Sequence, residues 1–440
     1  MRDETTLSAP APTVFPRRWA KVKTWTLRLA EYGSVQIGVQ ALNAIAGLLI
    51  VRYLSKPEYA LFAIVNSMQS TANLLADLGI GIGVRSIGGR VWQDRERFGQ
   101  LLNTTISLRR MFAAVSLTVT LPIAAWMLWH NGADWLLTLA LLGTVVLSII
   151  PLLASTAWGT SAQLHGEYRR MQKLDLGNAL LRCLAIGGLA LIKLNVVLAA
   201  AVGTITSWTA MIFLRLWARE KINHTAPVNA EDKREMIRLS LKSLPNTIFF
   251  CFQGQITLLI LTLVGNTKGI ADVMALGRIA VLFTIFSVTF SNVLAPRFAR
   301  CQDAVKLPNL YLLLVGGSSG LLFALSLIAW LLPGPFLWLL GPKYSSLENE
   351  LVWVVAASCV GMVGGVMWGL NSSKAWIHIQ AYGYMPSIIL CQVIAACLLD
   401  LRQFHDVLIF NLVSACAPLP VFAFDAVRGV KNLKSVSPDN

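Results

Sequence analysis

Two arginines inside apolar segments are the side chains of this chain that could most readily do chemistry. Arg278 lies about eight residues into one such segment, roughly 12 Å deep, and Arg182 lies at a similar depth in another. A charge in hydrocarbon is costly and normally faces a partner or a hydrated cavity. One interpretation is therefore a hydrated, positively charged cavity that suits a phosphate-bearing substrate.

Nearby carboxylates supply the competing interpretation, in which the charges only hold helices together. Asp175 precedes Arg182 by seven residues, which places both on one helix face two turns apart. Asp77 lies near the end of another apolar segment, with Arg85 just beyond, and suits a gating or structural salt bridge to a loop arginine. Arg278 has no carboxylate three or four residues away, so its sequence context favours the cavity.

Two glutamines add polar groups to a further apolar segment. Gln253 and Gln255 could line the same cavity, but hydrogen bonding between helices is the alternative. With the two arginines they complete the candidate substrate-binding set.

Enzyme motifs are scarce in the sequence. There is no GxxxxGK[ST] phosphate loop, and the five histidines show no metal-ligand spacing. The glycine-rich run 79–89 follows an apolar helical segment rather than a strand, so it suits a helix end better than a nucleotide cradle. We therefore predict no catalytic residue, no metal and no cofactor, and a protein that is not an enzyme.

The composition predicts a membrane protein. The chain has 440 residues, of which 55% are hydrophobic and 13% are charged, against about 25% charged in ordinary soluble domains. The net charge of +15 comes from short basic clusters between apolar stretches. That distribution argues against a nucleic-acid partner and for membrane lipids as the surroundings.

Twelve apolar segments are long enough to cross a bilayer core of about 30 Å, which takes roughly 20 helical residues. If the N-terminus is cytoplasmic, 29 of the 37 Lys and Arg residues fall on the cytoplasmic side and six on the other, as the positive-inside rule requires. The predicted spans are 31–52, 58–80, 110–129, 135–156, 174–193, 195–217, 245–265, 270–294, 309–332, 347–370, 381–400 and 405–425.

The longest loop on the cytoplasmic side divides the spans into two sets of six. We predict a basic cytoplasmic N-terminus (1–30), an N-lobe (31–217), a linker with a short interfacial helix (218–244), a C-lobe (245–425) and a cytoplasmic tail (426–440). The fold class is therefore an all-α polytopic membrane protein, and both ends of the chain are expected in the cytoplasm.

The segment 51–86, VRYLSKPEYALFAIVNSMQSTANLLADLGIGIGVRS, resembles the opening of Wzx-type polysaccharide flippases. The first outer turn in that family is similar to R-x-L-x-x-x-x-Y-G. Arg52, Leu54 and Tyr59 match this pattern, whereas Ala60 stands where glycine is usual.

Two further motifs are similar to the same family, which belongs to the multidrug/oligosaccharidyl-lipid/polysaccharide (MOP) exporter superfamily. The second span of that family ends in D-L-G, as residues 77–79 do here. The segment SNVLAPRFAR (291–300), with Pro296 at the end of the eighth span, also looks similar. Beyond residue 300 the plan of spans matches more than the residues do.

The resemblance implies a MATE-like fold, with two six-helix lobes around a central cavity that work by alternating access. It implies a flippase in the bacterial inner membrane that moves a polyprenyl-diphosphate-linked oligosaccharide to the periplasmic leaflet for O-antigen, lipopolysaccharide or other surface polysaccharide. A polysaccharide polymerase or glycosyltransferases are the implied pathway partners. Arg278 and Arg182 match no family motif, so the resemblance assigns them no role.

Two other functions stay open at this point. A cation-coupled exporter of drugs or metabolites would share the fold but needs acidic residues deep in the N-lobe, whereas Asp77 and Asp175 lie near the cytoplasmic face. A membrane polysaccharide polymerase or ligase needs a large charged periplasmic loop, and the outer loops here are short.

Overall fold

The computed structural model describes residues 15–77, 80–91, 93–165, 167–220, 222–223, 226–264, 266–279, 290, 298, 306–374, 376 and 379–436. All of the regular structure in these ranges is helical. Eight of the described helices are long and apolar enough to cross a membrane, and two shorter apolar helical segments lie at Gln253–Leu263 and Tyr382–Leu398.

The first half of the chain forms a bundle of antiparallel helices, the N-lobe. Its pairs α5 with α7, α2 with α4, and α1 with α6 make the main contacts. The helices are α1 (Phe15–Tyr53), α2 (Lys56–Asp77), α3 (Ile80–Val91), α4 (Arg95–His130), α5 (Trp135–Leu164), α6 (Tyr168–Ile192) and α7 (Val196–Arg219).

The second half forms a second bundle, the C-lobe, in which α14 packs against α12 and α16. Its helices are α8 (Ala230–Leu263), α9 (Thr267–Ile279), α12 (Lys306–Leu331), α13 (Pro333–Leu340), the 3-10 turn η3 (Pro342–Tyr344), α14 (Glu348–Ser373), α15 (Gln380–Leu398), α16 (Phe404–Cys416) and α17 (Leu419–Val436).

The predicted spans coincide with these helices. Spans one to seven fall in α1, α2 and α4–α8, and spans nine to twelve in α12, α14, α15 and α16–α17. The eighth span begins in α9, but most of 280–294 lies outside the described residues. Pro333 separates α12 from the short α13, because proline cannot continue a helix from the preceding turn.

Helix α8 differs from the prediction. A separate interfacial helix was expected within the linker, but α8 runs without a break through Pro245 to Leu263. The side chain of Asn229 caps its first turn by accepting hydrogen bonds from the backbone N–H groups of Glu231 and Asp232, so the helix begins well before the membrane span. Along its length α8 packs against α2, α3 and α4 of the N-lobe, and Asp232 in its first turn is bonded to Arg97 of α4.

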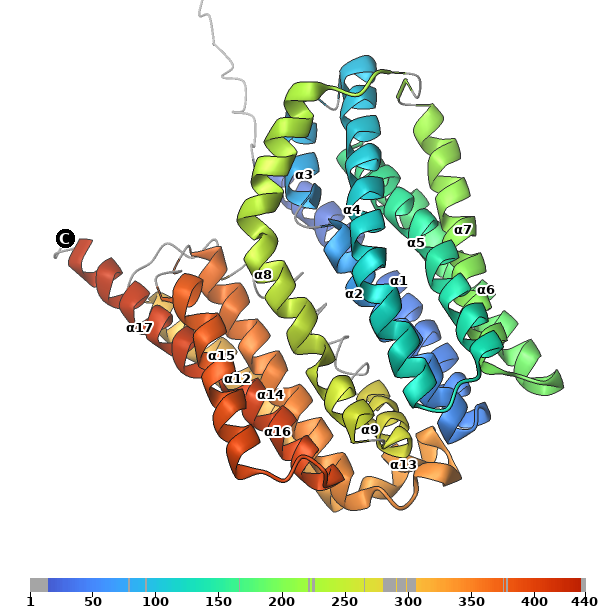
Figure 1. Ribbon diagram of the computed structural model, residues 1–440. Helices are drawn as coiled ribbons and strands as arrows, with labels where there is room; N and C mark the ends of the chain where they lie inside the picture. Colours follow the sequence, from blue (N-terminus) through green and yellow to red (C-terminus); the bar gives the residue numbers. More distant parts are fainter. Residues whose placement is uncertain are drawn as a thin grey trace, which may run out of the picture.

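The two lobes meet at one end of the molecule and diverge towards the other. Figure 1 shows them close together around α9 and α13, and apart at the end where α8 begins and the chain ends. The largest hydrophobic cluster contains residues of both lobes. A smaller cluster around Phe98 combines N-lobe residues with Met236 of α8, and another around Trp376 lies within the C-lobe. The end at which the lobes meet is called the junction below.

Candidate functional site: the contact between the lobes

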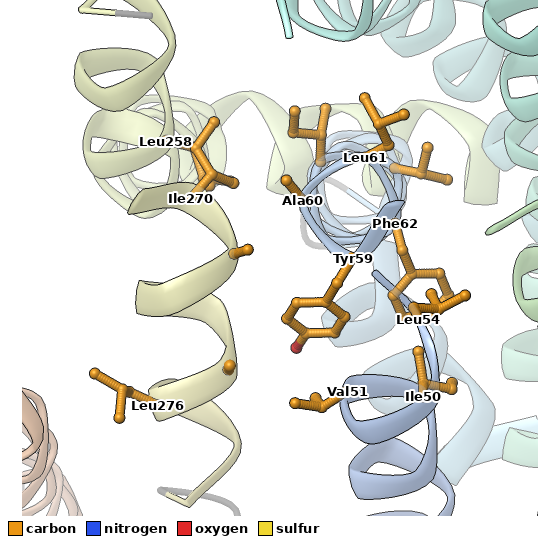
Figure 2. Close-up of a cluster of buried hydrophobic side chains, with 14 of the residues drawn as sticks. Ile50, Val51, Leu54, Tyr59, Ala60, Leu61, Phe62, Leu258, Ile270 and Leu276 are labelled. Atoms are coloured by element: carbon orange, nitrogen blue, oxygen red, sulfur yellow. The ribbon is translucent and has the colours of Figure 1, made fainter. Parts of the chain in front are cut away.

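An apolar core seals the junction. Tyr59 is fully buried between the α1–α2 corner and α9, and Figure 2 shows Ile270 of the C-lobe on the side that faces α2. Leu54, which lies next to Phe62 in Figure 2, is also fully buried. Burying side chains of this size contributes roughly 1.5–3 kcal/mol each, so this contact is a stable arrangement of the lobes.

Charged and polar side chains at the edge of the junction connect the two lobes. The ammonium of Lys56, at the start of α2, lies 2.8 Å from a carboxylate oxygen of Asp272 on α9. From the C-lobe, Lys343 donates hydrogen bonds to the backbone carbonyls of Leu54 (2.7 Å) and Arg52 (3.2 Å). Asn131, at the end of α4, accepts a 2.8 Å hydrogen bond from Thr267 at the start of α9.

The ring of Tyr344 contacts the lysine of this ion pair. This ring is fully buried in η3 and lies 5.0 Å from the Lys56 ammonium, a cation–π contact. Burial raises the pKa of Tyr344 above its usual range, so the phenol stays neutral at physiological pH. A neutral ring can face a cation and a carboxylate without adding a charge of its own.

Arg278 reaches from α9 to the N-lobe next to this core. Its Nε donates a 3.2 Å hydrogen bond to the hydroxyl of Tyr59, which in turn donates to the backbone carbonyl of Met274. The guanidinium lies across α1 at Gly47, where an added Cβ would be 3.4 Å from Nη1. The terminal nitrogens Nη1 and Nη2 make no hydrogen bond or ion pair to any residue that the structure describes.

Arg182 approaches the same region from α6, the neighbour of α1. It is half-buried, and its positive charge interacts with that of Arg278. Within the described part of the chain, Arg182 has no carboxylate partner: Asp175 is exposed two turns away and forms no ion pair with it. Two like charges near each other without a counter-ion favour an anion between them.

Asp77 forms an ion pair with Arg109, a residue that the sequence had placed in a loop. Arg109 lies inside α4, and its guanidinium also donates to the carbonyl of Leu153 (3.2 Å) and to the hydroxyl of Thr156 on α5. The Arg109 side chain is 4% exposed and that of Asp77 is 41% exposed. Arg85 lies in α3, but its side chain lies outside the described residues.

The two glutamines on α8 have different surroundings. Gln255 is buried and bridges the lobes: its Oε1 accepts from Ser67 (2.8 Å) and its Nε2 donates to Thr71 (2.7 Å) on α2. It is therefore fully engaged between helices rather than free for a substrate. Gln253 is half-buried on another face of α8.

The structure thus places Arg278 and Arg182 close enough for their charges to interact, engages Gln255 between α8 and α2, and pairs Asp77 with Arg109. The sequence analysis did not single out Lys56, Asp272 and Lys343, and it counted Arg109 as a loop residue, since all four lie at the edges of apolar segments. Among the described residues there is no cluster of His, Cys, Asp and Glu that could hold a metal ion.

No protein-family model matches the sequence, and none of the curated proteins matches it. Several solved structures, by contrast, are similar to this chain. A structure described as the inward-facing conformation of a multidrug resistance MATE family transporter of the MOP superfamily aligns with a TM-score of 0.67, at 16% identity over 92% of this chain and 100% of that one. The chain has the MATE transporter fold.

Two further MATE-fold structures align less closely. The outward-facing conformation of a multidrug resistance MATE family transporter gives a TM-score of 0.57 at 19% identity, covering 93% of this chain and 96% of that one. A MOP superfamily transporter from Pyrococcus furiosus, described by a reversed polarity of its binding pocket, gives 0.57 at 16% identity with the same coverage.

Proposed function

We propose that this protein is a flippase that moves a polyprenyl-diphosphate-linked oligosaccharide from the cytoplasmic to the periplasmic leaflet, for export of surface polysaccharide. The observation that carries the proposal is the pair Arg278 and Arg182, which approach each other where the lobes meet without a carboxylate partner among the described residues. A diphosphate needs cationic hydrogen-bond donors to leave water. Nη1 and Nη2 of Arg278, which have no partner in the described part of the chain, are donors of this kind.

The basic residues indicate which side of the membrane each end of the molecule faces. The end opposite the junction holds the starts of α4 and α8, with Arg97, Arg234 and Arg238. The positive-inside rule places this end in the cytoplasm, and with it both chain ends. The junction then lies on the periplasmic side of a bacterial inner membrane, so the lobes are open towards the compartment in which lipid-linked sugars are assembled.

Alternating access requires the junction to open. We expect Lys56→Met to raise the fraction of molecules with an open junction about five- to thirtyfold, because Asp272 loses its cation and Tyr344 its cation–π partner, together about 1–2 kcal/mol. Pulsed EPR distances between spin labels at Tyr53→Cys and Ser345→Cys, one on each lobe, measure this fraction.

The matched control for the junction is Lys193→Met. Lys193 is an exposed lysine between α6 and α7 and forms no ion pair with the described residues. It carries the same change of charge without the contact. An equal shift of the distance distribution in both variants would show that net charge, rather than the Lys56–Asp272 pair, holds the lobes together.

A drug or metabolite exporter is the second candidate, since two of the similar structures are described as multidrug transporters. A cationic drug would need an unpaired carboxylate inside a cavity. Asp77 and Asp272 are each paired with a basic residue, and Asp175, which has no ion pair among the described residues, lies exposed two turns into α6. The MOP superfamily transporter with reversed pocket polarity indicates that pocket charge can differ within one fold. The arginine pair therefore favours an anionic substrate.

The deciding experiment is the fate of lipid-linked oligosaccharide in cells that lack the gene, with its leaflet determined by a membrane-impermeant probe. A flippase predicts accumulation in the cytoplasmic leaflet, reversed by the wild-type gene. Accumulation in the periplasmic leaflet would instead indicate a polymerase or ligase step. No accumulation, combined with increased drug sensitivity, would indicate the exporter.

A further inference from the structure

One face of α8 joins a basic patch to an apolar groove. Near the helix start, Arg234 and Arg238 line a shallow hollow together with Ile237 and Leu241. Further along, α8 forms one wall of a groove about 270 Å³ in volume. Spacings of three or four residues place both on one stripe of the helix, which continues through Leu241, Leu244, Ile248, Cys251, Gln255 and Leu259.

The groove opens sideways between α4 and α8, which run next to each other in Figure 1. Its other wall is α4, where Val115 and Val119 are 61% and 50% exposed. These valines lie in the middle of a predicted membrane span, so the medium in front of them is lipid. An apolar groove with this opening receives hydrocarbon chains rather than water.

The polar atoms at the base of the groove already have partners. Ser116 donates to the backbone carbonyl of Ala72 (2.9 Å), and Gln255 is held by Ser67 and Thr71. No polar group there requires a hydrogen bond from an occupant. The lining of α4 extends from Phe112 to Ile123, about 16 Å, which is close to the depth of one leaflet, half of a core of about 30 Å.

The arginines at the end of the stripe are free. Neither Arg234 nor Arg238 has an ion-pair partner among the described residues, and both are exposed. The opposite face of the same turns is fixed to the N-lobe, because Asp232 accepts a 2.7 Å hydrogen bond from Arg97 and raises the pKa of that arginine. Two arginines held at the membrane surface are a binding site for a phosphate headgroup.

We propose that this stripe is a binding site for an anionic membrane phospholipid, with the headgroup phosphate on Arg234 and Arg238 and one acyl chain in the groove between α4 and α8. The site is separate from the arginine pair between the lobes and does not depend on what the protein transports. Helix α8 runs from the N-lobe to the junction. A lipid bound in the groove between α4 and α8 therefore stabilises the conformation in which these two helices are in contact.

The test uses the full-length protein in phosphatidylcholine nanodiscs that contain a trace of phosphatidylglycerol with a photoactivatable acyl chain. Crosslinked peptides are identified by mass spectrometry. We expect labels within 112–123 and 244–259, and competition by unlabelled phosphatidylglycerol but not by phosphatidylcholine. Arg234→Ala with Arg238→Ala should lower this labelling roughly ten- to thirtyfold, and Val119→Trp should block it by filling the groove.

Matched controls separate the site from general effects. Arg428→Ala with Lys431→Ala removes two exposed basic residues of α17, and Ile205→Trp adds an indole to a lipid-exposed position on α7; both should leave the labelling unchanged. Labels outside these two segments, or equal labelling in the arginine double variant, would overturn the proposal. So would displacement of the probe by undecaprenyl phosphate at concentrations far below those of phosphatidylglycerol, which would identify the occupant as a polyprenyl lipid.

Discussion

Replacing Arg278 with alanine is expected to lower the rate of oligosaccharide flipping by about ten- to a hundredfold. The terminal nitrogens of Arg278 are unused in the described structure and lie beside a second cation, Arg182. A charge-assisted hydrogen bond to a phosphate contributes about 1.5–3 kcal/mol, and its loss produces a change of this size. The measurement is lipid-linked oligosaccharide in the cytoplasmic leaflet of cells that express only the variant.

Tyr59→Phe tests whether Arg278 acts on the substrate or only on the junction. This variant removes the hydrogen bond from Arg278 but leaves its charge in place. If Arg278 binds the diphosphate, Tyr59→Phe should retain most of the flipping rate, and Arg278→Lys should retain part of it because the charge remains without the guanidinium fork. Equal loss in Tyr59→Phe and Arg278→Ala would mean that Arg278 only fastens α9 to the N-lobe.

A substitution in α1 also tests whether the Arg278 guanidinium acts on the substrate. Gly47 leaves room for the Arg278 guanidinium, so Gly47→Leu should displace that side chain without removing it. We expect a loss of flipping close to that of Arg278→Ala. A normal rate in Gly47→Leu would place the active position of the guanidinium elsewhere.

The fold could be predicted from the sequence because lipid imposes a strict length and charge pattern on each span. Spans such as 135–156 and 347–370 are long and apolar, and they lie within α5 and α14. The continuity of α8 could not be predicted. A helix was expected in the linker, but Pro245 separates its polar first turns from the apolar span, and proline usually ends a helix.

The candidate site was only partly accessible from the sequence. A charge deep in an apolar run is visible in the sequence, so Arg278 and Arg182 could be singled out. The partners of charges near the ends of spans depend on which helices are neighbours in space. For this reason Arg109 was counted as a loop residue, although it is buried in α4 beside Asp77. Residues 78–79 and all of the segment 291–300 except Phe298, which carried part of the family resemblance, lie outside the described residues.

Removing one partner of the ion pair between Asp77 and Arg109 should destabilise the N-lobe. Asp77→Ala leaves the Arg109 guanidinium buried without its counter-charge, which costs about 3 kcal/mol. We take the low end of the range for buried pairs because the Asp77 carboxylate is partly exposed. The apparent midpoint of thermal unfolding in detergent should fall by about 5–10 °C.

Replacing Arg109 instead of Asp77 should lower the stability less. This difference between the two single variants is the sharpest test of the ion pair. Arg109→Met fills the same volume with an uncharged chain and leaves Asp77 where water can reach it, so we expect a smaller fall in the unfolding midpoint. Adding Arg109→Met to Asp77→Ala should recover most of the lost stability, because the unpaired charge is gone. If the double variant is instead as unstable as the sum of the two single ones, Asp77 and Arg109 are not coupled, and the stability of the corner between α2 and α3 must come from packing alone.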